Sequence, residues 1–358
     1  LPGPAADPLG IRWRRVWEAL RRGAWRIPWR AWGLLVALIV GAYLRFYRLA
    51  ELPADLGWDL PYNYFDAQRV LNGELWVFYP DNMGREGMFF YLIAAVAKLI
   101  GLGPYAMRLA SALVGVAAIP AIYLLARECA DRETAVWAAL LLAVNKWHIV
   151  LTRSGYRVSL MPLFSILALY GLARGLRRGA PRDWAWCGLF LGLGLWTYKA
   201  FTFAWPTVVA VVAVYLLLNL WPKRGENSSP DLFANATWSV RPGAAIPGLG
   251  LALVVAVIVA TPMIRFVLDS PEVYATRELH GVQLVADSLG QGGGQLQLYA
   301  RSLLKGLQMF HYEGDGNSRF GVPYQRHFGL VSAALLALGA AWALARLRQR
   351  GHALLWTA

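Results

Sequence analysis

The sequence is poor in charged residues, and in acidic residues above all. Only 16% of its 358 residues are Asp, Glu, Lys or Arg, whereas soluble domains carry about a quarter. The 21 acidic residues stand against 35 basic ones, and 58% of the chain is hydrophobic. This composition excludes an ordinary water-soluble domain and indicates a protein that folds in lipid.

Cysteine is scarce as well, and the basic residues form no single patch. Cys129 and Cys187 lie far apart, in or beside apolar stretches. They have no metal-binding or redox spacing, so buried thiols are expected. The formal charge of +14 is spread over short clusters between apolar runs. That is the positive-inside pattern of membrane proteins, and it argues against nucleic acid as a partner.

Long uncharged runs predict membrane-spanning helices. Residues 200–222 and 242–264 each run for 23 positions without a charge, and about 20 helical residues cross the hydrocarbon core. Helices satisfy their own backbone hydrogen bonds there. We therefore predict an all-α, polytopic helical bundle. The predicted spans lie near 31–49, 104–126, 134–150, 158–175, 184–198, 200–220, 246–267 and 328–345.

Basic clusters predict the orientation of this bundle. Residues 1–30 hold seven arginines and read as a basic amphipathic segment on the cytoplasmic surface. The later basic clusters share that side only if residues 88–101 do not cross the membrane. We therefore expect 88–101 to dip into the outer surface of a multi-pass protein of a prokaryotic plasma membrane. The later clusters lie at 174–182, 223–224 and 346–350.

The chain is expected to form one transmembrane domain with two large external loops. The domain covers 31–345, and its loops, which are expected to carry short helices, are 51–103 and 269–327. Residues 346–358 look like the start of a further part of the protein. We therefore expect the sequence to be a fragment whose C-terminal part is missing.

The first external loop is rich in acidic residues. Residues 51–87 contain seven acidic residues and two arginines. Acidic side chains beside apolar helices cost free energy unless they are solvated or serve a site. Asp59 and Glu86 each lie within a few residues of an apolar helix, so both are candidates for function. A solvated surface is the expectation for Asp66, Glu74 and Asp81.

Seven short motifs follow one another in an order that resembles the GT-C membrane glycosyltransferases, and most of all glycosyltransferase family 39. That family includes protein O-mannosyltransferases and bacterial transferases that modify lipid A with aminoarabinose. The resemblance covers roughly residues 31–330. The motifs are Asp59-Leu60, Leu71-Asn72-Gly73, Gly84-Arg85-Glu86-Gly87, Met107-Arg108-Leu109, and the segments 123–127, 147–153 and 198–201.

The resemblance implies a glycosyltransferase that takes one sugar from a polyprenyl-phosphate donor and gives it to a protein, lipid or glycan outside the cytoplasmic face. By position in the family, Asp59 is the general base that takes the proton of the acceptor hydroxyl, and Glu86 is a second functional carboxylate. Arg153 and Arg157, with Arg108, are expected to bind the donor phosphate, because guanidinium forms two parallel hydrogen bonds to phosphate. The alternative for these arginines is snorkelling to lipid headgroups.

Two departures from the family pattern concern acidic residues. Leu60 stands where the family usually has a Glu after the first Asp. Residues 154–159 contain no acid, although related oligosaccharyltransferase subunits carry a metal-binding motif at this turn. A divalent metal is therefore not supported by a motif, and no cofactor is assigned.

Six further residues are candidates for substrate binding. Trp58 stands beside Asp59 and could stack on a sugar. His148 has the alternative of an ordinary interface residue, and the segment with Asp315 and Arg319 also reads as a turn-rich connector. The six are Trp58, Tyr62, His148, Lys199, Asp315 and Arg319.

Two rival functions fit parts of the sequence. A transporter or flippase of a lipid-linked substrate would share the hydrophobicity and the external arginines, but it should place ionisable residues in mid-helix along a path. The predicted spans are nearly free of charge at their centres. A structural or assembly protein would leave the acidic first loop without a purpose, so a glycosyltransferase is the preferred reading.

Overall fold

The computed structural model describes residues 29–53, 60–82, 84–220, 242–274, 295–314, 316 and 324–345. Helices make up most of this part of the chain. The strands within it are a single antiparallel pair of two residues each, β1 (Phe78–Tyr79) and β2 (Arg85–Glu86). The predicted all-α polytopic fold is confirmed, and the protein is an integral membrane protein.

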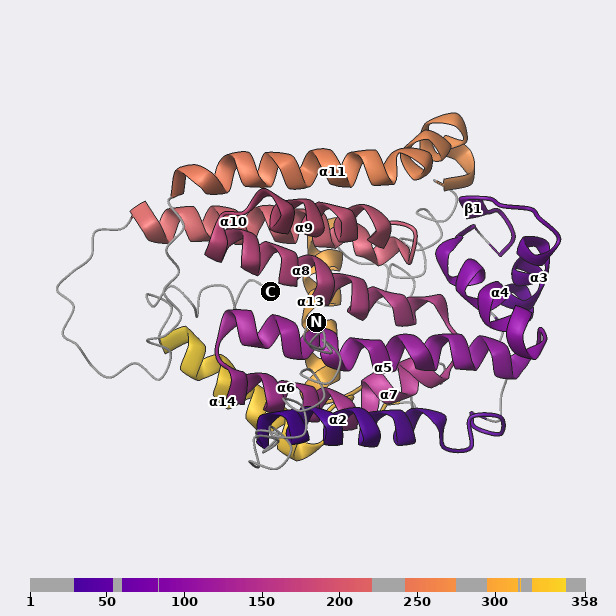
Figure 1. The fold of residues 1–358 in the computed structure, drawn as a ribbon, viewed down its shortest axis with the longest axis horizontal. Coiled ribbons are helices and arrows are strands. Elements are labelled where there is room, and N and C mark those ends of the chain that lie inside the picture. The colour runs from indigo at the N-terminus through magenta and orange to yellow at the C-terminus, as the bar shows by residue number, and fades with distance from the viewer. Residues whose placement is uncertain are drawn as a thin grey trace, which may run out of the picture.

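The long helices run side by side along the longest axis of the molecule (Figure 1). They form a bundle in which α8 packs on α9 and α5, and α9 packs on α11. The bounds of these long helices are α2 Trp29–Phe46, α5 Pro104–Cys129, α8 Leu160–Arg178, α9 Pro181–Gly194, α10 Ala204–Leu220 and α11 Pro242–Asp269.

The described residues hold fewer span-length helices than the eight predicted. Four are long and apolar enough to cross a membrane, and a bent pair makes a fifth if it counts as one span. Three shorter apolar helices lie at 32–46, 88–100 and 330–342. The four long ones lie at 104–129, 157–178, 199–217 and 243–269.

The span predicted at 134–150 is broken rather than continuous. Helix α6 (Arg132–Val144) and helix α7 (Lys146–Arg153) meet at an angle of 56°. The side chain of Asn145 caps α7 by accepting a hydrogen bond from His148 N at 2.9 Å. The fully buried Arg45 of α2 donates to Ala143 O at 3.0 Å. A helix end leaves carbonyls unsatisfied, and here an arginine from another helix satisfies one.

Small residues let the central helices approach closely. A Cβ at Gly171 of α8 would meet the backbone of Cys187 on α9, and a Cβ at Gly188 of α9 would overlap Ala252 O on α11. Such small-residue contacts are typical of helix packing in membranes. Cys129 and Cys187 are buried and free, as expected.

One end of the bundle carries the short elements of the first external loop. Helix α3 (Leu60–Leu71), the β pair and helix α4 (Met88–Ile100) gather there, at the right of Figure 1. The 13 residues of α4 span about 20 Å at 1.5 Å per residue, less than the roughly 30 Å of a hydrocarbon core. This length suits a helix that does not cross the membrane. That α4 does not cross stays a prediction.

The second loop, predicted at 269–327 with short helices in it, contains a helix of 17 residues. Helix α13 (Gln295–His311) lies within it and precedes α14 (Leu330–Ala345). The basic segments 1–28, 221–241 and 346–358 lie outside the described residues. The proposed orientation of the bundle therefore stays a prediction.

Candidate active site

The β pair fixes the direction of Glu86. Phe78 stands opposite Glu86, and Tyr79 stands opposite Arg85. Successive side chains of a strand point to opposite faces, so Arg85 and Glu86 reach in opposite directions. Gly84 precedes them with a φ of +82°, a conformation that glycine adopts at little cost.

Glu86 points to an arginine from a distant part of the chain. Its Oε2 lies 3.3 Å from Nε of Arg157, and the side chains of Glu86 and Arg157 are 2% and 16% exposed. Arg157 opens the short 3-10 helix η1 (Arg157–Ser159), which leads directly into α8. The carboxylate and the guanidinium thus meet at the end of the bundle that carries α3 and α4.

Aromatic rings and a second cation lie next to this pair. The Arg157 guanidinium carbon lies 5.4 Å from the centre of the Tyr198 ring. The next residue, Lys199, opens η2 (Lys199–Phe203) and places its Nζ 5.0 Å from the centre of the Tyr274 ring. Phe78, the strand partner of Glu86, lies 6.1 Å from Tyr274, centre to centre. We call Glu86, Arg157, Tyr198, Lys199 and Tyr274 the end cluster.

The backbone also ties the parts of the end cluster together. Met88 N, the first residue of α4, donates to Trp196 O at 3.2 Å. This bond joins the residue two positions after Glu86 to the turn that carries Tyr198 and Lys199. The end cluster therefore comes from four segments: β2, η1, the turn at 195–199 and the segment after α11.

The charges of the end cluster suit an anionic ligand. Two cations, Arg157 and Lys199, accompany one carboxylate, and both are partly buried. A guanidinium packed on an aromatic face and partly removed from water forms stronger hydrogen bonds to phosphate than an exposed one. Among the described residues, no group of three or more His, Cys, Asp or Glu side chains is arranged to hold a metal ion.

Comparison with known proteins identifies the fold. The family of dolichyl-phosphate-mannose-protein mannosyltransferases matches residues 87–264, which include Arg157 and Lys199. The fold is similar to the apo oligosaccharyltransferase of Archaeoglobus fulgidus, with a TM-score of 0.55 and 17% identity over 93% of this chain and 47% of that one. The chain therefore has the fold of the GT-C superfamily.

A second GT-C structure gives the same result. The oligosaccharyltransferase AglB of Archaeoglobus fulgidus, in complex with an inhibitory peptide and a dolichol-phosphate, has a TM-score of 0.54 and 17% identity over 92% of this chain and 46% of that one. The present chain thus spans about half the length of these structures. No match is found among curated protein sequences.

Two of the arginines that were predicted to bind phosphate donate hydrogen bonds to backbone carbonyls. Arg153 donates to Leu44 O at 2.6 Å and to Tyr47 O at 2.8 Å. Arg108 donates to Ala50 O at 3.0 Å. Both therefore secure the end of α2 and the residues after it. Phosphate binding by Arg153 and Arg108 stays a prediction, and the described contacts favour Arg157 for that role.

His148 is buried, and its partner is an arginine. It is 3% exposed, and its Nδ1 lies 2.7 Å from Nη2 of Arg45. A guanidinium can only donate, so Nδ1 accepts and the ring is in the tautomer with its proton on Nε2. Its place inside the packed break between α6 and α7 favours a structural role over substrate binding.

The remaining predicted site residues divide by their position. Tyr62 is 43% exposed, and its ring centre lies 5.4 Å from the guanidinium carbon of Arg85. Helix α3 begins at Leu60, directly after Asp59. The other candidates lie outside the described residues, so their roles stay predictions: Trp58, Asp59, Asp315 and Arg319.

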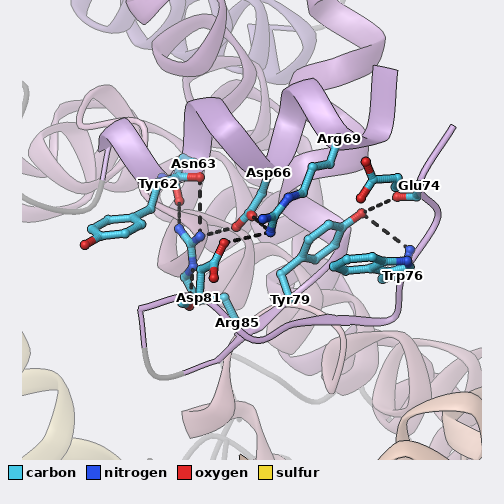
Figure 2. Close-up of polar contacts among 9 residues, drawn as sticks. All are labelled: Tyr62, Asn63, Asp66, Arg69, Glu74, Trp76, Tyr79, Asp81 and Arg85. Atoms are coloured by element: carbon cyan, nitrogen blue, oxygen red, sulfur yellow. Dashed lines mark hydrogen bonds and ion pairs between the residues drawn. The ribbon is translucent and has the colours of Figure 1, made fainter. Parts of the chain in front are cut away.

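Asp66 was expected on a solvated surface and is instead fully buried. Its carboxylate forms an ion pair with Arg85, and Arg69 approaches it at 3.4 Å. Figure 2 shows these contacts on one side of α3. Burial raises the pKa of the Asp66 carboxyl above its ordinary value, while the charges of Arg85 and Arg69 oppose the shift. Asp81 is partly exposed, with Arg69 2.7 Å away, and Glu74 is also partly exposed.

Asn63 is the residue of this region that the sequence reading missed. It is 2% exposed and forms two hydrogen bonds inside the protein. A signal for it exists in the sequence, because Leu60, Asn63 and Ala67 have the spacing of one buried helix face. Two polar residues at positions 63 and 66 on such a face indicate partners in the protein rather than water.

Proposed function

We propose that the protein is a glycosyltransferase that moves one sugar from a polyprenyl-phosphate donor to an acceptor on the outer side of the membrane. The observation that carries the proposal is the end cluster, in which partly buried Arg157 pairs with Glu86 and packs on Tyr198, while Lys199 packs on Tyr274. All of it except Glu86 and Tyr274 falls within the region that matches the mannosyltransferase family.

The end cluster fits the phosphate of a lipid better than a free nucleotide sugar. It lies at the end of a bundle of apolar helices, the depth at which a membrane-anchored phosphate must sit. Arg157 forms an ion pair with Glu86 through Nε and is partly exposed, and a guanidinium can bind a phosphate through two parallel hydrogen bonds. The dolichol-phosphate bound by the similar AglB structure supports a donor of this class.

The proposed reaction needs a base and a held leaving group. The acceptor hydroxyl oxygen attacks the anomeric carbon and forms the new glycosidic bond, and the bond from that carbon to the phosphate oxygen breaks. Polyprenyl phosphate leaves with the electron pair, and Arg157 and Lys199 balance its charge. Asp59 takes the hydroxyl proton. We prefer Asp59 over Glu86 as the base because Glu86 is engaged in an ion pair with Arg157, whereas Asp59 holds the position of the base in the family that the sequence resembles.

A reconstituted assay tests this function. The protein is placed in liposomes with polyprenyl phosphates that carry radiolabelled mannose, glucose, galactose or aminoarabinose, together with peptide, lipid and glycan acceptors. We expect transfer of label from one of these donors to one acceptor class, and loss of that transfer in the variant Arg157→Ala.

The same assay distinguishes the rival function. Movement of the labelled lipid between the two leaflets, with no label on any acceptor, would favour a flippase over a transferase. A donor preference for nucleotide sugars would contradict the lipid-linked donor but leave a transferase in place.

A further inference from the structure

The side chains on the buried face of α3 form a chain of hydrogen bonds that runs from Asp66 to the turn before Arg157. Asp66 forms an ion pair with Arg85. Arg85 Nη1 donates to Asn63 Oδ1 at 3.1 Å, and Asn63 Nδ2 donates to Gly155 O at 3.1 Å. We call these four residues the α3 bridge.

Two members of the α3 bridge lie close in sequence to Glu86 and Arg157. Arg85 directly precedes Glu86 in β2, and Gly155 lies two residues before Arg157. The bridge therefore joins the segment that carries the carboxylate to the segment that carries the guanidinium, from the opposite side of the β strand. No part of it is the Glu86–Arg157 pair itself.

The bridge is built for rigidity rather than for contact with water. Asp66 and Asn63 are 0% and 2% exposed, and Arg85 is 1% exposed. Arg85 is further fixed because Nη2 donates to Tyr62 O and Nε donates to Asp81 O, each at 3.3 Å. A buried network whose members are all satisfied holds one arrangement.

The far end of the bridge is equally constrained. Gly155 has a φ of +74°, and its N donates to Ser111 Oγ at 3.1 Å, which ties this turn to α5. The turn is thus held by α5 through its amide and by α3 through its carbonyl. A shift of α3 would move the Gly155 carbonyl and, with it, the residues that lead to Arg157.

We propose that Asn63 is a positioning residue that sets Glu86 and Arg157 in register for the donor phosphate. Its amide is the only member of the bridge that can link the two segments, because its oxygen accepts from Arg85 while its nitrogen donates to Gly155 O. Neither an acid nor a hydrocarbon of the same size can do both. The role of this register in donor binding rests on the proposed function. The effect of Asn63 on the relative position of Glu86 and Arg157 does not.

The variant Asn63→Asp separates the two bonds. The carboxylate keeps the size of the side chain and the bond from Arg85, but it loses the donor to Gly155 O and places an oxygen against that carbonyl. Asn72→Asp is the matched control, because it makes the same change at an exposed residue directly after α3. Asp66→Asn is a second variant, which weakens the bridge at its other end.

The first measurement does not depend on activity. Cysteines are placed by Glu86→Cys and Arg157→Cys, and the rate of their cross-linking by a short bifunctional thiol reagent is measured in membranes. We expect Asn63→Asp and Asp66→Asn each to lower this rate several-fold and Asn72→Asp to leave it unchanged. Unchanged rates in both bridge variants would overturn the proposal, whether or not the protein transfers sugar.

The second measurement uses transfer with a polyprenyl-phosphate donor. A misplacement of about 1 Å can cost about 10²-fold in rate, so we expect Asn63→Asp to lower kcat/KM for the donor by about 10- to 100-fold. In a double variant with Arg157→Lys, the loss should equal the larger single loss, because Asn63 acts through Arg157. Losses that multiply would show that Asn63 acts independently of Arg157 and would overturn the positioning role.

Discussion

Glu86 and Arg157 are 71 positions apart in the sequence and lie 3.3 Å apart between Oε2 and Nε. The contact is an ion pair through Nε, the one guanidinium nitrogen that is not terminal. The ion pair places the Glu86 carboxylate beside a guanidinium whose side chain is 16% exposed. This arrangement makes the behaviour of Arg157 the most direct test of donor binding.

Replacement of Arg157 should show that the fork matters as well as the charge. Lys keeps the charge but forms no paired hydrogen bonds to phosphate. We expect Arg157→Lys to raise the KM for the donor clearly, and Arg157→Ala to raise it more. Equal KM values for Arg157→Lys and the wild-type protein would favour the alternative that Arg157 contacts lipid headgroups.

Replacement of Asp59 should abolish transfer without unfolding the protein. A general base contributes about 10²- to 10⁴-fold to a rate, and Asp59→Asn keeps the size of the side chain while removing its basicity. We expect a fall in kcat of this size, with unchanged thermal stability and unchanged binding of polyprenyl phosphate. Near-complete transfer by Asp59→Asn together with its loss in Glu86→Gln would move the base to Glu86.

Replacement of Arg153 should affect stability rather than donor use. Its guanidinium donates to Leu44 O and Tyr47 O, and a buried or partly buried partner left unsatisfied costs about 1–3 kcal/mol. We expect Arg153→Ala to lower the melting temperature and to leave the KM for the donor unchanged. A raised KM with an unchanged melting temperature would support the phosphate-binding role predicted from the sequence.

Cysteine labelling tests the orientation of the bundle. Gln68 lies on the exposed side of α3. Arg178 is the last residue of α8, a helix of 19 residues that is about 28 Å long at 1.5 Å per residue. An impermeant reagent added from outside should modify Gln68→Cys and not Arg178→Cys. The reverse pattern would invert the topology and place the end cluster in the cytoplasm.

The sequence was sufficient for the class of fold because lipid imposes few solutions on the backbone. Long runs such as 242–264 must be helical in a membrane, and α11 (Pro242–Asp269) forms there. The break at Asn145 could not be read in the same way, because the carbonyls that it frees are satisfied by Arg45, a partner almost a hundred residues away. Periodicity within one segment carries no information about such a partner.

The sequence named the charged residues of the end cluster but did not predict that Glu86 pairs with Arg157. The motifs included Glu86 and Lys199, the acid-free turn at 154–159 supplied Arg157, and the structure places all three in the end cluster. Charge alone did not separate Arg157 from Arg153, because the difference lies in which atoms face each guanidinium. Asp66 was misjudged for the same reason: a helix face with Leu60 and Ala67 buries it, whatever the acidity of the surrounding loop.

The Arg45 side chain also has a consequence for how the membrane part is assembled. Arg45 is one residue from the end of α2, and an arginine there in a lone helix would reach for lipid headgroups. In the finished protein it is fully buried and bound to Ala143 O and to His148. Helix α2 therefore cannot complete these contacts until the chain has been synthesised past residue 148. Arg45 is synthesised about a hundred residues before Ala143 and His148, the residues that it binds.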